Sequence, residues 1–331
     1  MLWNWIVLVV GAMLIMRGGD LFTDSAVAIA QTTRIPKAIV GATVVSVATT
    51  FPEFMVSLTG ALRGQPDFAV GNALGSCQCN IGLIVGTTAL LKGVLARKRG
   101  TEPGIPAGRG ALLGPGMFML AAGVAAWAFS SFDAGDTGLR YGIAPWQAVI
   151  LLVVFIVYVA YSIITAFQSQ EGPQGDHAAA AERVKRQVIL FLVGAGLVAL
   201  GSRLMVANAE AIAKGLGWPE RVIGLTILAV GTSLPEYVVS AMAVWKGHGS
   251  LGIGNILGAN ILNICWVVAT CALIGPLPIQ ESTVFLDGPV ALLLMFLLVG
   301  LAWRRERISV PSGAVLFAVY VAYIVTLLTS S

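Results

Sequence analysis

The sequence has few charged residues and very little histidine. Only 11% of its 331 residues are charged, whereas a soluble domain carries roughly a quarter. So few charges cannot cover a water-facing surface, which argues against an ordinary soluble enzyme. The two histidines fall in expected loops, and the four cysteines lie in apolar segments without histidine at metal-ligand spacing. Neither a zinc or copper centre nor a disulfide framework is therefore expected, and no cofactor is predicted.

The chain has long apolar runs instead. Hydrophobic residues make up 57% of it, and many runs reach the roughly 18 residues needed to cross a bilayer core as a helix. The first run lacks a basic leading segment and a cleavage site, so we interpret it as a spanning helix. The sequence predicts an all-α integral membrane protein in a lipid bilayer. The ten expected spans are 2–16, 38–62, 70–91, 110–129, 145–167, 187–204, 220–245, 251–275, 287–303 and 311–329.

The placement of Lys and Arg predicts the orientation of the chain. The net charge of +4 does not indicate nucleic-acid binding, because basic residues form short clusters between apolar runs. These clusters follow the first, third, fifth and ninth runs, and the positive-inside rule places those exits in the cytoplasm. Both termini would then lie outside the cytoplasm, in a plasma membrane. We expect a monomer with two five-helix halves, 1–168 and 187–331, joined by a cytoplasmic linker at 169–186.

An internal repeat is the most specific feature of the sequence. Residues 40–81 align with 223–264 without a gap, and the identities include Pro, Glu, Gly and Asn, which chance matches between apolar runs do not favour. Five spans separate equivalent helices, so the two copies would cross the membrane in opposite directions. Such an inverted repeat is typical of secondary transporters, whose substrate site lies at the midplane between the copies.

Each copy carries a Pro-Glu pair in the middle of a predicted span, Pro52-Glu53 and Pro235-Glu236. An ionised carboxylate at bilayer depth costs about 2.5–3.5 kcal/mol or more, and no Lys or Arg lies centrally in any repeat helix. A bound cation is the expected partner, with protonation as the alternative. Each proline also frees the carbonyl four residues before it, and nearby threonine and serine add hydroxyls. Two carboxylates among neutral oxygens suit calcium, and sodium accepts the same oxygens.

The second helix of each copy adds close-packing glycines and polar side chains. Glycine pairs four residues apart let helices approach closely. One turn further, the first copy has Ser76 and Asn80, where the second has Ala259 and Asn263. The asparagines are candidate ligands, although hydrogen bonding between helices is an alternative role.

The segments Gly231–Glu236 and Gly254–Asn263 carry the motifs Gly-Thr-Ser-Leu-Pro-Glu and Gly-Asn-x-x-Gly-Ala-Asn-x-x-Asn, and Ala48–Glu53 is a looser first copy. These motifs resemble the alpha repeats of the sodium/calcium exchanger family. The resemblance implies that the first and sixth helices slide against an eight-helix core. It implies calcium ligation by the side chains of Glu53 and Glu236 and the carbonyls of Thr49 and Thr232. It implies sodium ligation by the Ser46 and Ala229 carbonyls and by the hydroxyls of Thr50, Ser233 and Ser76.

Two positions depart from the family pattern. Ala259 stands where the family usually has serine, and Asn263 stands where several members have aspartate. Both departures affect the sodium sites that the resemblance implies, and with them the stoichiometry and coupling of sodium. Calcium ligation needs neither residue. The leading hypothesis is an antiporter that exchanges calcium for sodium by alternating access. The alternative is calcium/proton exchange through the same two glutamates, whereas an intramembrane enzyme or a passive channel has little support.

Overall fold

The computed structural model describes residues 2–64, 66–131, 140–168, 177–217 and 229–330. Within these ranges nine helical segments are long and apolar enough to cross a membrane, which confirms the predicted all-α membrane fold. The predicted span 220–245 is described only from Ala229 onward. The spans, with π-helical turns named η, are α1 (Leu2–Thr33); α2 (Lys37–Val40), η1 (Gly41–Val45) and α3 (Ser46–Leu62); α4 (Pro66–Gln78), η2 (Cys79–Val85) and α5 (Gly86–Arg99); α6 (Arg109–Ala111), η3 (Leu112–Gly116) and α7 (Met117–Ser131); α8 (Pro145–Gln168); α9 (His177–Gly215); α11 (Ala229–Thr232) and α12 (Leu234–Trp245); α13 (Gly249–Leu262), η6 (Asn263–Val268) and α14 (Ala269–Ile274); η7 (Thr283–Asp287) and α15 (Gly288–Trp303); and α16 (Val310–Ser330).

The first and sixth helices are much longer than the predicted spans 2–16 and 187–204. The helix α1 continues to Thr33, and α9 runs from His177 to Gly215, so its first ten residues belong to the segment expected as a linker. Polar residues such as Arg17 end the apolar run without ending the helix. The extension is stabilised by packing between the two helices, where the Phe22 and Phe191 rings lie 4.3 Å apart.

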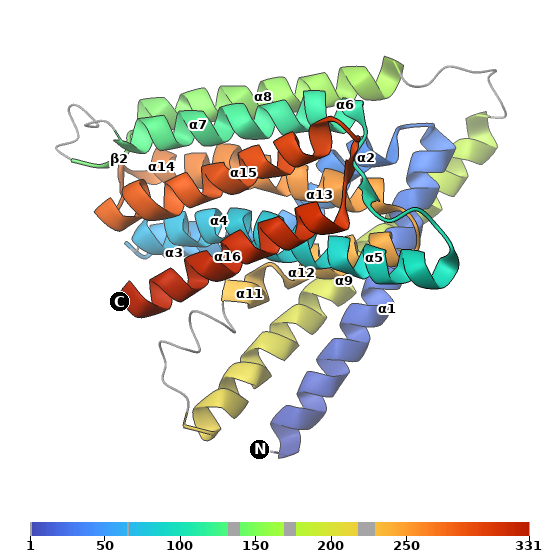
Figure 1. Cartoon of the computed structure of the whole chain (residues 1–331), viewed down its shortest axis with the longest axis horizontal. Helices are drawn as coiled ribbons and strands as arrows, with labels where there is room; N and C mark the ends of the chain where they lie inside the picture. The colour runs from blue at the N-terminus through green and yellow to red at the C-terminus, as the bar shows by residue number, and fades with distance from the viewer. Residues whose placement is uncertain (1, 65, 132–139, 169–176, 218–228, 331) are drawn as a thin grey trace.

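Two close crossings hold α1 and α9 together as a pair. A Cβ on Gly11 would lie 2.9 Å from the Gly201 carbonyl oxygen, and a Cβ on Gly18 would lie equally close to that of Gly194. Side chains larger than hydrogen therefore cannot be placed at these crossings without moving a backbone. Figure 1 shows the pair running obliquely across the other helices, which lie roughly parallel to one another.

The inverted repeat is visible in local structure as well as in sequence. The helix after each Pro-Glu helix contains a π-helical turn that ends at the same repeat position, η2 at Val85 and η6 at Val268. Both turns are packed in the interior, where α4 contacts η6 and α13 contacts η2. Each copy thus packs against the other, and the largest buried apolar cluster draws residues from both halves of the chain.

Two short antiparallel strand pairs connect the halves at their loops. Strand β1 (Ile105–Pro106) pairs with β4 (Arg307–Ile308), and β2 (Gly142–Ile143) pairs with β3 (Leu277–Pro278). The repeat relates one pair to the other, because β1 and β3 follow equivalent helices and β2 and β4 precede equivalent helices. Paired loops must lie on the same side of the membrane. The predicted ten-span topology meets this requirement for both pairs.

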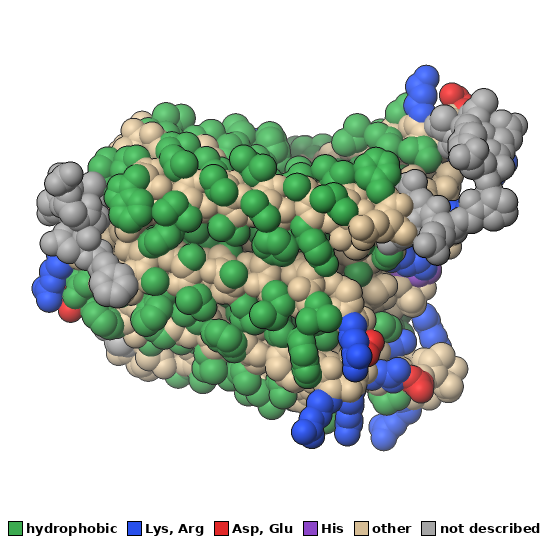
Figure 2. Space-filling view, turned by 90° about the horizontal axis from the view of Figure 1, so that it is seen from above, with side chains coloured by type: hydrophobic (Ala, Val, Ile, Leu, Met, Phe, Trp, Pro, Cys, Tyr) green, Lys and Arg blue, Asp and Glu red, His purple; other side chains and the backbone are tan. Residues whose placement is uncertain are grey.

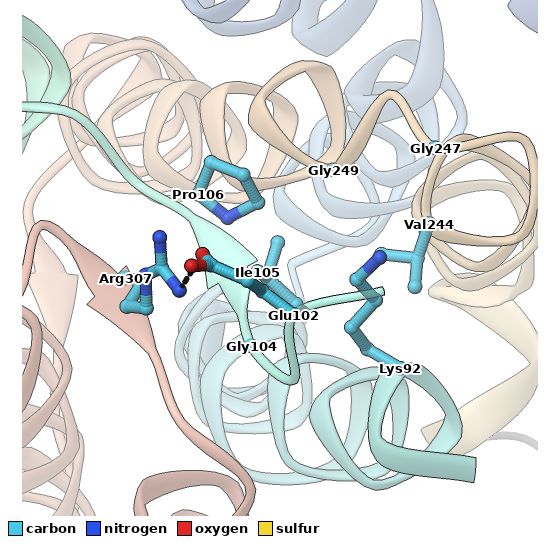
Figure 3. Close-up of a pocket in the computed structure, with 9 residues that line it drawn as sticks. All are labelled: Lys92, Glu102, Gly104, Ile105, Pro106, Val244, Gly247, Gly249 and Arg307. Carbon is cyan, nitrogen blue, oxygen red and sulfur yellow. Dashed lines mark ion pairs between the residues drawn. The ribbon is translucent and has the colours of Figure 1, made fainter. Parts of the chain in front are cut away.

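A small pocket lies beside the β1–β4 pair, away from the repeat glutamates. Figure 3 shows Glu102 and Arg307 forming an ion pair on one side of it and Lys92 approaching from α5 on the other. The turn between α12 and α13 closes the pocket with Gly247 and Gly249. Its lining has one acid between two bases, so it does not resemble a cation site.

The surface separates into apolar and basic regions. Figure 2 shows hydrophobic side chains over the long flank of the molecule and Lys and Arg concentrated toward one end. Exposed basic residues cluster where α5 ends, at Arg97, Lys98 and Arg99, and where α15 ends, at Arg304 and Arg305. An apolar belt with charges beyond it is the surface expected of a bilayer-spanning bundle.

Candidate ion-binding site

Glu53 and Glu236 are both completely buried. Within the described residues, the carboxyl groups of Glu53 and Glu236 lie within hydrogen-bonding reach of each other. Apart from that mutual contact, neither oxygen of Glu53 has a hydrogen-bond partner, and Oε1 of Glu236 has one. That partner is the Thr50 hydroxyl of α3, which donates at 3.4 Å. Since Thr50 and Glu53 are one turn apart, this contact brings the two glutamates toward the same site. Acceptor groups left unpaired at such depth are suited to a cation.

The helix is interrupted next to Glu236. Ser233 has a non-helical backbone (φ −89°, ψ 9°) and separates α11 from α12, and Pro235 stands in the first turn of α12. Glu236 therefore lies at the beginning of a helix, where the macrodipole favours a negative charge. In the first copy Pro52 lies inside the continuous helix α3, where its missing N–H leaves the Ala48 carbonyl without its usual donor.

Hydroxyl groups near the glutamates make contacts between the two copies. Thr49 Oγ1 donates to Asn255 Oδ1 at 3.1 Å and also lies 3.3 Å from the Ser46 carbonyl oxygen. Ser233 Oγ donates to Ser76 Oγ at 3.4 Å. The Thr49–Asn255 and Ser233–Ser76 contacts each join the Pro-Glu segment of one copy to the second repeat helix of the other copy. The predicted ligand groups thus form one cluster built from both halves of the repeat.

The two asparagines of the π-helical turns are also buried with unused polar atoms. Asn80 Nδ2 donates to Asn260 Oδ1 at 3.0 Å, but Asn80 Oδ1 has no partner in the described part of the chain. Neither side-chain polar atom of Asn263 has one either. A π-helical turn is often found at a functional site because it redirects side chains out of the regular helical register.

The structure places nearly all predicted ligand residues in the buried interior. Thr232 is partly buried, and Ala229 is the first residue of α11. No group of three or more His, Cys, Asp and Glu that could hold a metal occurs among the described residues, so the site depends on two acids and neutral oxygens. The buried members are Ser46, Thr49, Thr50, Glu53, Ser76, Asn80, Ser233, Glu236 and Asn263.

Two further asparagines support the site, although they were not among the predicted ligands. Asn72 Nδ2 donates to the Glu53 carbonyl oxygen at 3.3 Å and to Ser57 Oγ at 2.9 Å. Its repeat equivalent Asn255 contacts Ser240 Oγ at 3.5 Å, besides accepting from Thr49. Both copies of the repeat carry asparagine at this position, and that match could have marked the two residues in the sequence. The repeat alone does not show which side chains these asparagines contact.

Comparison with known proteins agrees with this architecture. The family model described as sodium/calcium exchanger protein matches residues 3–164 and 186–329. The inner membrane protein YrbG of Escherichia coli is 33% identical over 90% of this chain and 88% of its own, and the sodium/calcium exchanger MaX1 of Methanosarcina acetivorans is 27% identical over 98% of both. The solved structure of the sodium-calcium exchanger NCX_Mj superposes with a TM-score of 0.82 at 26% identity, covering 98% of each chain. The chain belongs to the sodium/calcium exchanger protein family.

Proposed function

We propose that this protein is a secondary antiporter that exchanges calcium for sodium across a membrane. The observation that carries the proposal is the pair of fully buried glutamates, Glu53 and Glu236, one from each copy of the repeat, with no buried cationic side chain among the described residues. Calcium prefers six to eight oxygen ligands, and two carboxylates balance its charge. The names of MaX1 and NCX_Mj, both sodium/calcium exchangers, support the same pair of ions.

The proposed calcium ligands are the side chains of Glu53 and Glu236 and the carbonyl oxygens of Thr49 and Thr232. The carbonyls lie in the turns that precede the prolines, where the helical hydrogen-bond pattern is incomplete. The proposed sodium ligands occupy the same cluster, so the two ions would compete for shared oxygens. They are the Ser46 and Ala229 carbonyls and the hydroxyls of Thr50, Ser233 and Ser76, with the amides of Asn80 and Asn263 adjacent.

Alternating access is proposed to occur by movement of α1 and α9 as one unit. The glycine crossings hold these two helices together, whereas an apolar groove separates α9 from α3 and α8. The groove walls carry Ala195 and Gly196 on α9 and Phe51 and Val159 on the other helices. Apolar surfaces of this kind allow one helix to slide past another with little penalty.

We propose a plasma-membrane location with the β1–β4 end and its basic clusters in the cytoplasm and both termini outside. The concentration of Lys and Arg at one end supports this orientation through the positive-inside rule. The polar segment 169–186 would then be cytoplasmic, between the halves 1–168 and 187–331. Each described half contributes to a single ion cluster, so one chain suffices for a complete site and we propose a functional monomer.

Flux measurements on the purified protein in proteoliposomes test the function directly. An outward sodium gradient alone is expected to drive calcium accumulation, and collapsing that gradient should stop it. An equal proton gradient without sodium is expected to drive much less, because MaX1 and NCX_Mj, to which this chain is similar, are named sodium/calcium exchangers. Calcium flux driven by protons but not by sodium would replace the proposal with calcium/proton exchange.

Thr49→Val is expected to weaken calcium binding about tenfold, because it removes a hydroxyl that positions the proposed carbonyl ligand. The substitution preserves shape but leaves Asn255 Oδ1 without its 3.1 Å donor, a loss of roughly 1–3 kcal/mol. Thr59→Val is a matched control, since the Thr59 hydroxyl is exposed and donates to the Met55 carbonyl of its own helix. The calcium dependence of transport should change in the first variant alone. Equal calcium dependence in both would show that the Thr49–Asn255 contact does not position a ligand.

A further inference from the structure

Two ion pairs join the helix α1 to the end of α12. The ammonium group of Lys246 lies 2.9 Å from Asp20 Oδ1 and 2.8 Å from Asp24 Oδ1. It also donates to the Asp20 carbonyl oxygen at 3.3 Å. Asp20 and Asp24 are one turn apart on α1, so both carboxylates reach the same base. The Lys246 side chain is only 21% exposed, so salt screens these pairs less than it screens ordinary surface pairs.

The turn that carries Lys246 is fixed to the rest of the bundle. Arg99 Nη1 of α5 donates to the Trp245 carbonyl oxygen at 2.7 Å. Gly247 and Gly249 line the pocket beside β1, as Figure 3 shows. Lys246 is therefore anchored at the β1–β4 end of the molecule, outside the α1–α9 pair.

The helix α1 also approaches α12 directly before its acidic residues. A Cβ on Gly19 would lie 2.7 Å from Val238 Cγ1 of α12. This close contact fixes the position of α1 along α12. A slide of α1 by one helical turn, about 5.4 Å, would separate Lys246 from its two partners.

The repeat extends to the α1–α9 pair. Its register also aligns Gly11 with Gly194 and Gly18 with Gly201. These glycines form the two crossings, Gly11 with Gly201 and Gly18 with Gly194. Exchanging the copies therefore exchanges the crossings, so α1 and α9 are equivalent in structure as well as in sequence.

The equivalent positions of the other copy cannot form the same ion pairs. In the register of the repeat Arg63 corresponds to Lys246, and each residue directly follows its Pro-Glu helix. The two acids of α1 correspond to Arg203 and Ala207 of α9. These positions hold two bases and no acid, so bringing them together would oppose like charges.

An inverted repeat relates the two conformations of a transporter to each other, because the second conformation arises when the copies exchange roles. The two conformations would have equal energy in a perfectly symmetric chain. In this chain the exchange separates Lys246 from its acids and moves Arg203 toward Arg63 instead. Attraction is lost and repulsion is gained.

We infer that Asp20, Asp24 and Lys246 form an ionic latch that holds α1 against the core at the β1–β4 end, and that each transport cycle must break it. The inference rests on the proposed function, because it concerns the movement of the α1–α9 pair in alternating access. The latch is expected to favour the conformation seen here about tenfold over the second one.

Distance measurements by pulsed electron paramagnetic resonance in lipid nanodiscs test the latch. Spin labels at Gln31→Cys on α1 and Lys98→Cys on α5 report the position of α1, since both residues are exposed and the native cysteines are buried. Lys246→Met should raise the ratio of the second distance to the first about tenfold, because both ion pairs are lost. Lys246→Arg keeps the charge and should leave the ratio unchanged. An unchanged distribution in Lys246→Met would overturn the latch.

Two further variants keep the test decisive. Asp20→Asn with Asp24→Asn removes the same pairs from the α1 side and replaces Lys246→Met if that variant does not fold. Arg109→Met is the matched control, because it breaks the ion pair with Glu306 without touching α1, and its distances should not change.

Arg203→Asp tests the asymmetry while the latch stays intact. The new acid would pair with Arg63 in the second conformation, so the share of that conformation should rise. Combined with Lys246→Met, the two effects should multiply. An Arg203→Asp variant that folds and keeps the original distances would refute the role of the unequal charges.

The outcomes separate the latch from the proposed function. Sodium-driven calcium uptake in proteoliposomes, together with unchanged distances in Lys246→Met, would reject the latch alone. Absence of sodium-driven uptake in the unmodified protein, together with the expected shift in Lys246→Met, would contradict sodium/calcium exchange and support the latch.

Discussion

Glu53→Gln and Glu236→Gln are each expected to reduce calcium transport by at least about 100-fold, since each removes one of two negative charges facing the ion. Two unit charges about 4 Å apart attract by about 4 kcal/mol at an effective dielectric constant of 20, which corresponds to roughly a thousandfold in affinity. Glutamine keeps the size and one oxygen, so the fold should be preserved. Radioactive calcium uptake in proteoliposomes measures the loss.

Thermal unfolding in detergent distinguishes a lost ligand from a lost fold. Without calcium, the glutamine variants should be at least as stable as the unmodified protein, because a buried unpaired carboxylate destabilises the folded state. Calcium should raise the melting temperature of the unmodified protein and fail to raise that of the variants. Glu306→Gln, which breaks only the surface ion pair with Arg109, should transport and respond to calcium normally. Normal calcium affinity at either buried position would disprove the site assignment.

Gly258→Ala is expected to destabilise the protein by about 1–3 kcal/mol and to abolish most transport, because α13 crosses η1 with no room for a side chain. A Cβ at Gly258 would lie 2.3 Å from the Ala42 carbonyl oxygen and 2.5 Å from Ser46 Oγ. The added methyl group must push apart the two helices that carry the proposed ligands. Melting temperature and calcium uptake would be measured together.

Gly300→Ala is the matched control for this substitution. Gly300 lies in the helix α15, and a Cβ there meets no described atom within 4 Å. Alanine should therefore be tolerated, with a gain of up to about 1 kcal/mol from helix propensity. If Gly258→Ala were as stable and active as Gly300→Ala, the close crossing at α13 would not be needed for the site.

Composition and hydropathy predicted the fold because a membrane core requires long apolar helices, and the structure confirms them. The same signal failed at the ends of α1 and α9. The apolar run ends at Arg17, but the helix continues because Phe22 packs on Phe191 and Gly18 lies close to Gly194. These contacts join segments that are distant in sequence. The strands β1 to β4 were missed for a similar reason, since two-residue strands have no periodic pattern.

For the candidate site, the repeat predicted which residues would be brought together, and the structure buries most of them as one cluster. The repeat could not predict contacts across copies. Thr49 meets Asn255, and Ser233 meets Ser76, only because α3 and α12 pack against the second helix of the other copy in a particular register. That register depends on how closely the helix backbones approach each other at Gly41 and Gly258. The sequence alone does not predict that distance.

The strand pairs described above also constrain the order of assembly during synthesis. Strand β1 belongs to the first half of the chain and β4 follows α15, near the C-terminus, so their hydrogen bonds can form only when translation is almost complete. Glu53 likewise enters the bilayer long before the ribosome has produced Glu236. The early half must therefore persist in the membrane as an unfinished bundle. A chain truncated before β4 would lose the last helix, α16. It would also leave strand β1 of the first half without its partner strand.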